Sequence, residues 1–226
     1  MVIYLEVRKV SANADFESGT DIEYNPETSP HEPPHQLKLK VRAYFKEVAG
    51  KIEHTYVVTG PYSDLYFGPN LGSFNVVEKK AVLCGTGNEK VSFTSMEDVG
   101  KLTVAAILAP EASRNATLIV NSFTCTPAEI ADEYQKQIGE KWDISTTSLE
   151  KLKELEKEAY AKKNPAATVF TLRRIWTEGG TLYDYRDNEK LGHVQLETLE
   201  EQVRKNIENQ TGTKSWTSPI LGLSST

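Results

Sequence analysis

Between residues 36 and 48, apolar side chains recur at the spacing of one helix face, which predicts a helix. The positions that we expect to point into the core are Leu37, Val41, Phe45 and Val48. Lys38 and Arg42 lie four residues apart and therefore share a different face of the same helix. Residues 54–59 then combine β-branched and aromatic side chains, which is typical of a strand.

Residues 75–84 and 90–94 are predicted to form two further strands, joined through Gly85-Thr86-Gly87-Asn88. A G-x-G pattern can bind phosphate where it links a strand to a helix. Here strands are expected on both sides of the turn, so the pattern favours a β-hairpin.

From residue 95 onward, helices are predicted to alternate with short strands. Ser95, Thr126 and Thr147 stand where N-cap residues are expected, and a glutamate follows Thr126 and Thr147 at the capping-box distance. We expect Asp98 to help cap its own helix. The predicted elements are a helix at 97–108, a strand at 117–121, a helix from 126 to about 139, an edge strand at 142–145, a helix after 147, a helix at 164–177 and a last helix that ends by 212.

The two ends of the chain differ in composition from its middle. Residues 1–10 resemble one strand or the stump of one, and residues 11–36 are rich in Ser, Pro, Glu and Asp, as in an irregular loop of low order. The tail at 213–226 is rich in Ser and Thr and is predicted to be loose. The expected division is therefore a strand stump and loop at 1–36, an α/β part at 37–125, a mostly helical part at 126–212 and the tail.

Composition and charge narrow the class of protein. The chain has 226 residues, 38% of them hydrophobic, and a net charge of −6, which argues against a nucleic-acid partner or an anionic membrane surface. The opening residues are too short and too charged for a secretory signal, so we expect a cytoplasmic protein. In that compartment, Cys84 and Cys125 should be reduced and partly buried. The four histidines have no common ligand spacing, so no metal site is predicted.

Four segments carry a more specific signal through their order and spacing, namely Gly19-Thr-Asp-Ile-Glu-Tyr24, Lys38-Leu-Lys-Val-Arg42, Thr55-Tyr-Val-Val-Thr-Gly-Pro-Tyr62 and Phe93-Thr-Ser-Met-Glu-Asp-Val-Gly100. Together they resemble the NmrA-like and isoflavone-reductase-like group of the short-chain dehydrogenase superfamily. The resemblance implies a Rossmann-like α/β domain that binds NADP(H), with a smaller domain over a small-molecule substrate.

The resemblance also implies roles for individual residues. Lys38 would be the general acid/base and would lie near the nicotinamide, where an ammonium group can stabilise developing negative charge and transfer a proton. Thr59, Gly60, Pro61 and Tyr62 would border the nicotinamide and the substrate. The substrate implied is a small aromatic or conjugated compound that is reduced at the expense of NADPH. The oligomeric state is left open.

One departure from the family is plain, because no G-x-G-x-x-G follows a strand anywhere in the sequence. We therefore expect the C-terminal part of a Rossmann-like fold with the N-terminal nucleotide-binding half missing. The strand at 55–59 would then expose a hydrophobic edge.

Three functions stay open at this point. The chain could be a reductase, a non-catalytic NAD(P)-sensing regulator, or a degenerate fragment without cofactor affinity. Lys38 favours the first, and the absent glycine-rich turn favours the third. Each site residue also has a structural alternative. Lys38 can be a solvated helix lysine, and Tyr56, Tyr62 and Tyr66 can belong to the core instead of a pocket.

Overall fold

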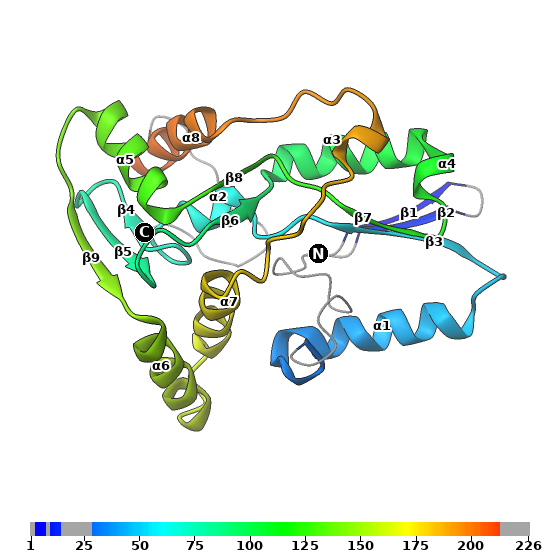
Figure 1. Ribbon diagram of the computed structural model, residues 1–226, viewed down its shortest axis with the longest axis horizontal. Helices are drawn as coiled ribbons and strands as arrows, with labels where there is room; N and C mark the ends of the chain where they lie inside the picture. Colours follow the sequence, from blue (N-terminus) through cyan, green and yellow to red (C-terminus); the bar gives the residue numbers. More distant parts are fainter. Residues whose placement is uncertain (1–2, 8–9, 15–28, 213–226) are drawn as a thin grey trace.

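The computed structural model describes residues 3–7, 10–14 and 29–212. Its largest sheet has four strands in the order β1-β2-β3-β7 (Figure 1). Strands β2, β3 and β7 run parallel to one another, and β1 runs antiparallel to β2. The four strands are β1 (Ile3–Val7), β2 (Val10–Ala14), β3 (Glu53–Val58) and β7 (Ala116–Ile119).

Two helices cover opposite faces of this sheet, α1 (Gln36–Glu47) and α3 (Met96–Leu108) (Figure 1). Side chains alternate along β3, and this alternation determines which helix each one meets. Tyr56 contacts Phe45 of α1, whereas Val57 packs with Leu102 of α3. The result is the layered α/β arrangement predicted from the sequence.

Two smaller sheets lie at the other end of the molecule. One has the order β4-β5-β9, with β9 at its edge as predicted. The other is an antiparallel pair of β6 and β8. Their bounds are β4 (Phe74–Asn75), β5 (Lys80–Cys84), β6 (Val91–Phe93), β8 (Phe123–Cys125) and β9 (Asp143–Thr147).

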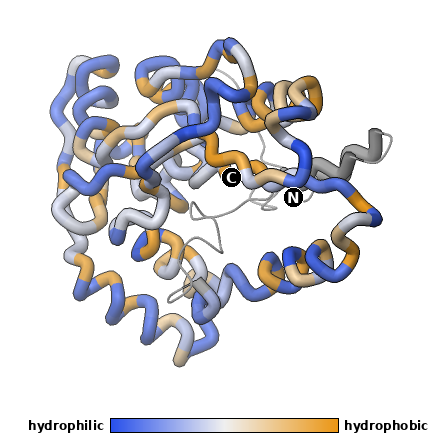
Figure 2. Tube along the Cα trace, turned by 45° about the vertical axis from the view of Figure 1, so that its right-hand side comes forward, coloured by the Kyte–Doolittle hydropathy of each residue, from blue (hydrophilic) through white to orange (hydrophobic). Residues whose placement is uncertain are grey.

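Helices α5, α6, α7 and α8 lie around these small sheets, whereas the short helix α4 packs against β7 and α3 (Figure 1). Along these helices hydrophilic and hydrophobic residues alternate, as one-sided burial requires (Figure 2). Among the described residues, no helix is both long and apolar enough to cross a bilayer. The largest core cluster is aromatic and contains Tyr66, Phe67, Phe74, Phe93, Tyr134, Trp142 and Trp176. The helices are α2 (Ser63–Tyr66), α4 (Pro110–Ser113), α5 (Pro127–Ile138), α6 (Leu149–Ala161), α7 (Ala167–Thr177) and α8 (Leu199–Thr211), with short 3-10 turns η1 (Ser29–His31), η2 (Pro33–His35) and η3 (Asn188–Leu191).

The predicted hairpin across residues 85–88 is wrong. Strand β5 pairs with β4 and β9, whereas β6 pairs with β8, so the two strands that flank the turn do not pair with each other. The single strand predicted at 75–84 is also interrupted. The Asn75 side chain accepts a hydrogen bond from Glu78 N at 2.9 Å, and this local turn folds β4 back onto β5.

Two helix details also differ from the prediction. Leu37, which was predicted to point into the core, is 75% exposed. Phe45 is buried as predicted, and the other buried residue of α1 is Arg42. The cap of α6 is Ser148, since Thr147 is the last residue of β9 and no capping box forms there. The capping box predicted at Thr126 is present.

The expectation that β3 exposes a hydrophobic edge is wrong. Strand β3 has a neighbour on each side, β2 and β7, and Val57 and Val58 are buried. Strand β1 lies within residues 1–10, which were predicted to be one strand or a stump. The start of the predicted irregular loop is wrong, because Val10–Ala14 form β2 and pair with both β1 and β3. The predicted tail at 213–226, and the part of the irregular loop that contains Gly19-Thr-Asp-Ile-Glu-Tyr24, lie outside the described residues.

Candidate functional site

The loop that follows β3 is held firmly beside the end of β6. Thr59, Gly60, Pro61 and Tyr62 are all buried. Thr94 donates a hydrogen bond from Oγ1 to the Thr59 carbonyl at 2.5 Å and from its backbone N–H to the Pro61 carbonyl at 3.2 Å. Gly60 has a φ of +69°, a backbone conformation that glycine adopts without strain. The four residues predicted to border a ligand thus form one rigid turn at the carboxyl end of a parallel strand, where ligands of open α/β sheets bind.

Helix α1 packs on β3 through Phe45 and Arg42. The Phe45 ring stacks on His54 at 5.0 Å between centroids, and the Arg42 guanidinium carbon lies 4.2 Å from the centroid of the Tyr56 ring. The helix and the strand therefore run in opposite directions, since moving back along α1 means moving forward along β3.

This register fixes the direction in which Lys38 lies. Lys38 is four residues before Arg42, a rise of roughly 6 Å along the helix. Two residues along the strand from Tyr56 cover roughly the same distance and reach Val58. Lys38 is therefore carried toward the carboxyl end of β3, on the side where Thr59 begins the buried turn.

The tyrosines separate into two groups. Tyr66 belongs to the aromatic core, with its ring centroid 4.8 Å from that of Phe93, and burial raises its pKa well above the ordinary value. Tyr62 is buried beside Val99. Tyr56 is half-buried and carries the cation–π contact with Arg42. The core alternative is thus right for Tyr66, and Arg42 is a packing partner.

The turn Gly85-Thr86-Gly87-Asn88 already binds a carboxylate of its own chain. The Thr86 N–H donates to both carboxylate oxygens of Glu89, at 3.0 and 3.1 Å, and the Thr86 hydroxyl donates to one of them at 3.0 Å. Burial raises the pKa of Glu89, but the hydrogen bonds from Thr86 and Gly87 outweigh it and lower the pKa overall. Because Glu89 occupies these donors, this turn does not fit a nucleotide phosphate.

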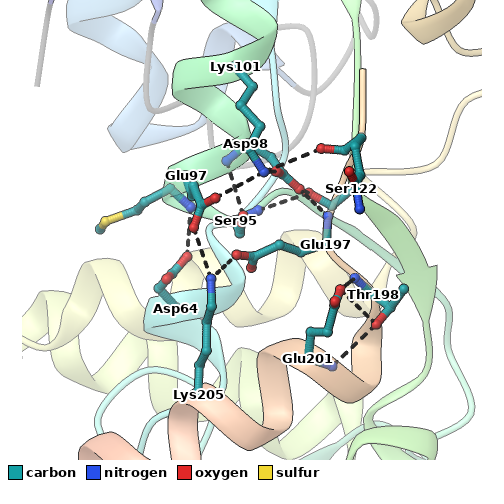
Figure 3. A network of polar contacts seen from close by, with 12 residues as sticks. Asp64, Ser95, Glu97, Asp98, Lys101, Ser122, Glu197, Thr198, Glu201 and Lys205 are labelled. Carbon is teal, nitrogen blue, oxygen red and sulfur yellow. Dashed lines mark hydrogen bonds and ion pairs between the residues drawn. The ribbon is translucent and has the colours of Figure 1, made fainter. Parts of the chain in front are cut away.

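A buried aspartate organises the start of α3 (Figure 3). The Asp98 side chain is fully buried and accepts hydrogen bonds from Lys101 Nζ at 2.8 Å, Ser122 Oγ at 2.6 Å and Glu197 N at 2.7 Å. The cap of α3 is the Ser95 hydroxyl, which accepts from Asp98 N. The carboxylate of Asp98 therefore does not cap the helix as predicted, and joins three separate segments instead.

Charged side chains surround this aspartate and line a surface pocket of about 420 Å³. The pKa of Glu97 is lowered to about 2, first because Lys205 donates a hydrogen bond to it and second because Lys101 does so. Glu197 also pairs with Lys205, which lowers the pKa of Glu197. Burial has the larger effect, so the pKa of Glu197 is raised overall. Local patterns did not predict this network, because Ser122 and Glu197 lie 24 and 99 residues from Asp98, and Lys205 lies 108 residues from Glu97.

The described residues contain no group of three or more His, Cys, Asp or Glu side chains that could hold a metal ion. Cys84 and Cys125 are free and buried, as predicted, and burial raises the pKa of both thiols.

Comparison with known proteins gives a consistent picture. The profile of the NmrA-like family matches residues 18–186. The phenylcoumaran benzylic ether reductase IRL1 of Ginkgo biloba is 30% identical over 141 residues, which are 59% of this chain and 44% of that protein. The chain thus spans less than half the length of this relative.

Solved structures share the fold. A crystal structure of isoflavone reductase superposes with a TM-score of 0.71 at 21% identity. The superposed region is 87% of this chain and 65% of the isoflavone reductase chain. The structure of AtPrR2 with NADP+ and (+)pinoresinol gives a TM-score of 0.71 at 22% identity. The superposed region is 88% of this chain and 64% of the AtPrR2 chain. At these identities the likeness establishes a Rossmann-like fold of which this chain spans about two-thirds.

Proposed function

This chain belongs to the NmrA-like family, and from that premise we propose that it forms the substrate-side part of an NADP(H)-dependent reductase that acts on a small aromatic or conjugated compound. The observation that carries the proposal is the register of α1 on β3, which directs Lys38 toward the buried turn at Thr59. Relatives and fold neighbours include reductases, and one neighbour was solved with NADP+ and (+)pinoresinol.

In the proposed reaction, Lys38 is the general acid/base. Bound NADPH would supply the hydride, whose electron pair forms a new C–H bond. The displaced π electrons would leave negative charge at the other end of the conjugated system. The Lys38 ammonium stabilises that charge and delivers the proton, so that hydride and proton together complete a two-electron reduction. The turn at Thr59, Gly60, Pro61 and Tyr62 would border the substrate, and the hydrogen bonds that Thr94 donates to the Thr59 and Pro61 carbonyls keep this border in place.

One observation favours a second candidate function, that of a family member without dinucleotide affinity. The G-x-G turn in the described part of the chain is filled by Glu89 and offers no free cradle for a pyrophosphate. A chain of this kind would keep the fold but would neither bind nor oxidise NADPH.

A titration of the purified chain with NADPH, followed by nicotinamide fluorescence, tests the proposal. Binding together with NADPH oxidation in the presence of an aromatic probe such as pinoresinol, or of a conjugated ketone, supports the reductase. Binding without turnover of any conjugated probe supports an NAD(P)-sensing regulator. No binding at high micromolar NADPH leaves the second candidate.

A further inference from the structure

Arg174 of α7 contacts three carboxylates at once. Its Nη2 lies 2.6 Å from Glu32 Oε2, its Nε lies 2.6 Å from Glu156 Oε2, and its Nη1 lies 2.9 Å from Glu178 Oε2. Arg174, Glu32 and Glu156 are each largely shielded from solvent. A guanidinium group suits this arrangement, because its planar fork can direct donors to several carboxylates in fixed positions.

The three carboxylates come from two different parts of the chain. Glu156 belongs to α6, and Glu178 directly follows α7, so both remain within the helical pair that contains Arg174. Glu32 instead precedes η2, which leads directly into α1. Of these three ion pairs, therefore, only the one with Glu32 reaches across to α1.

Glu32 is joined tightly to the start of α1. Its carbonyl accepts hydrogen bonds from His35 N at 3.0 Å and from Gln36 Nε2 at 3.1 Å. Pro33 and Pro34 restrict the backbone between Glu32 and the helix. A displacement of the Glu32 side chain would thus move the start of α1 at Gln36, which is two residues before Lys38.

Lys38 lies between two attachment points of the same helix. At the far end, Arg42 and Phe45 hold α1 on β3. At the near end, Arg174 holds the segment that begins α1 through its ion pair with Glu32. We propose that Arg174, through Glu32, is a positioning residue that fixes where α1 presents Lys38. This inference rests on the proposed role of Lys38 and adds a mechanical link between the helical part of the chain and its candidate site.

The structure provides a matched control for this proposal. Glu32→Gln and Glu178→Gln each remove one negative charge from the same guanidinium group. Only Glu32→Gln releases α1, so a difference between the two variants reports positioning and not the general loss of an ion pair.

Hydrogen–deuterium exchange of the whole chain, read at peptides within residues 36–47, tests the link without any ligand. We expect exchange in α1 to become about tenfold faster in Glu32→Gln and in Arg174→Gln, and to stay unchanged in Glu178→Gln. Unchanged exchange in Glu32→Gln, or equal acceleration in Glu32→Gln and Glu178→Gln, would overturn the proposal.

Steady-state kinetics with NADPH and pinoresinol give the second measurement. Glu32→Gln should lower kcat about tenfold with little change in KM, since a small displacement of a catalytic group reduces the rate of the chemical step. A KM effect without a kcat effect would contradict the positioning role. If the unmodified chain does not oxidise NADPH, the proposed function fails, and the exchange experiment still decides whether Arg174 holds α1.

Discussion

The Arg42 guanidinium carbon lies 4.2 Å from the centroid of the Tyr56 ring and joins α1 to β3 through a cation–π contact. Arg42 is only 2% exposed, so water screens the contact weakly. This contact fixes the register of α1 along β3, because it aligns Arg42 with Tyr56, and the register determines the direction in which Lys38 lies.

Replacing Tyr56 with Leu should lower the free energy of unfolding by about 1–2 kcal/mol, because the ring contacts both Arg42 and Phe45. Urea unfolding of the variant and the original chain measures the difference. Tyr44→Leu is the control. Its ring also lies near Phe45, with 6.1 Å between centroids, but Tyr44 is 55% exposed, so its loss should change stability by less than about 0.5 kcal/mol. Equal losses in the two variants would contradict the importance of the contact.

Replacing Lys38 with Ala should abolish NADPH-dependent reduction while leaving NADPH affinity nearly unchanged. The reason is that the proposed ammonium group acts on charge that develops only during the reaction. Lys40→Ala removes an exposed lysine from the same helix and should leave both quantities unchanged. Unchanged turnover in Lys38→Ala would remove this lysine from the mechanism.

Asp98→Asn should lower the free energy of unfolding by about 3 kcal/mol, as expected when one partner of a buried ionic network is lost. The new amide N–H group would face Lys101 or Ser122, which both donate hydrogen bonds to Asp98. Ser122→Ala removes one of these donors and also the acceptor of the Ser95 N–H group, and should cost less, about 1–2 kcal/mol. Guanidinium chloride unfolding compares the two, and a smaller effect for Asp98→Asn would show that the network contributes little.

The low pKa of Glu97 predicts a contribution to acid stability. The folded-state pKa of about 2 lies below the ordinary value of 4.5, so the stabilisation is present above pH 4.5 and is lost as the pH falls from 4.5 to 2. The Glu97 side chain is 57% exposed, so the contribution should stay below about 1 kcal/mol. Thermal unfolding of Glu97→Gln should therefore be less sensitive to pH in this range, and an unchanged pH profile would rule out the effect.

Two glycines should respond in opposite directions to substitution by alanine. Gly85 has a φ of +67°, and an added Cβ would lie 2.7 Å from the Glu89 carboxylate, so Gly85→Ala should destabilise by about 1–2 kcal/mol. Gly100 lies within α3 with no atom near an added Cβ, so Gly100→Ala should stabilise by about 0.5–1 kcal/mol. Thermal unfolding measures both shifts, and stabilisation by Gly85→Ala would show that Glu89 does not constrain this turn.

Local sequence patterns predicted much of the secondary structure. The helix that carries Lys38, the cap at Ser95, the capping box at Thr126 and the edge strand after Trp142 all form close to their predicted positions. These features depend on residues within one or two turns of each other, so the sequence contains their signal directly. The family resemblance was equally accessible, because it rests on ordered short motifs, and it is confirmed by the match over residues 18–186.

The pairing of strands and the use of charged side chains were decided by tertiary structure. The same β5 segment could pair with β6 or with β9, and only the position of β9, some sixty residues later, selects the second arrangement. Arg42 is buried while Leu37 is exposed, because the aromatic surface of β3 accepts a guanidinium group. Asp98 and Arg174 likewise find their partners only when distant segments meet. The sequence by itself therefore determined the elements and the family, whereas the contacts that orient the candidate site arise from long-range packing, which local periodicity does not encode.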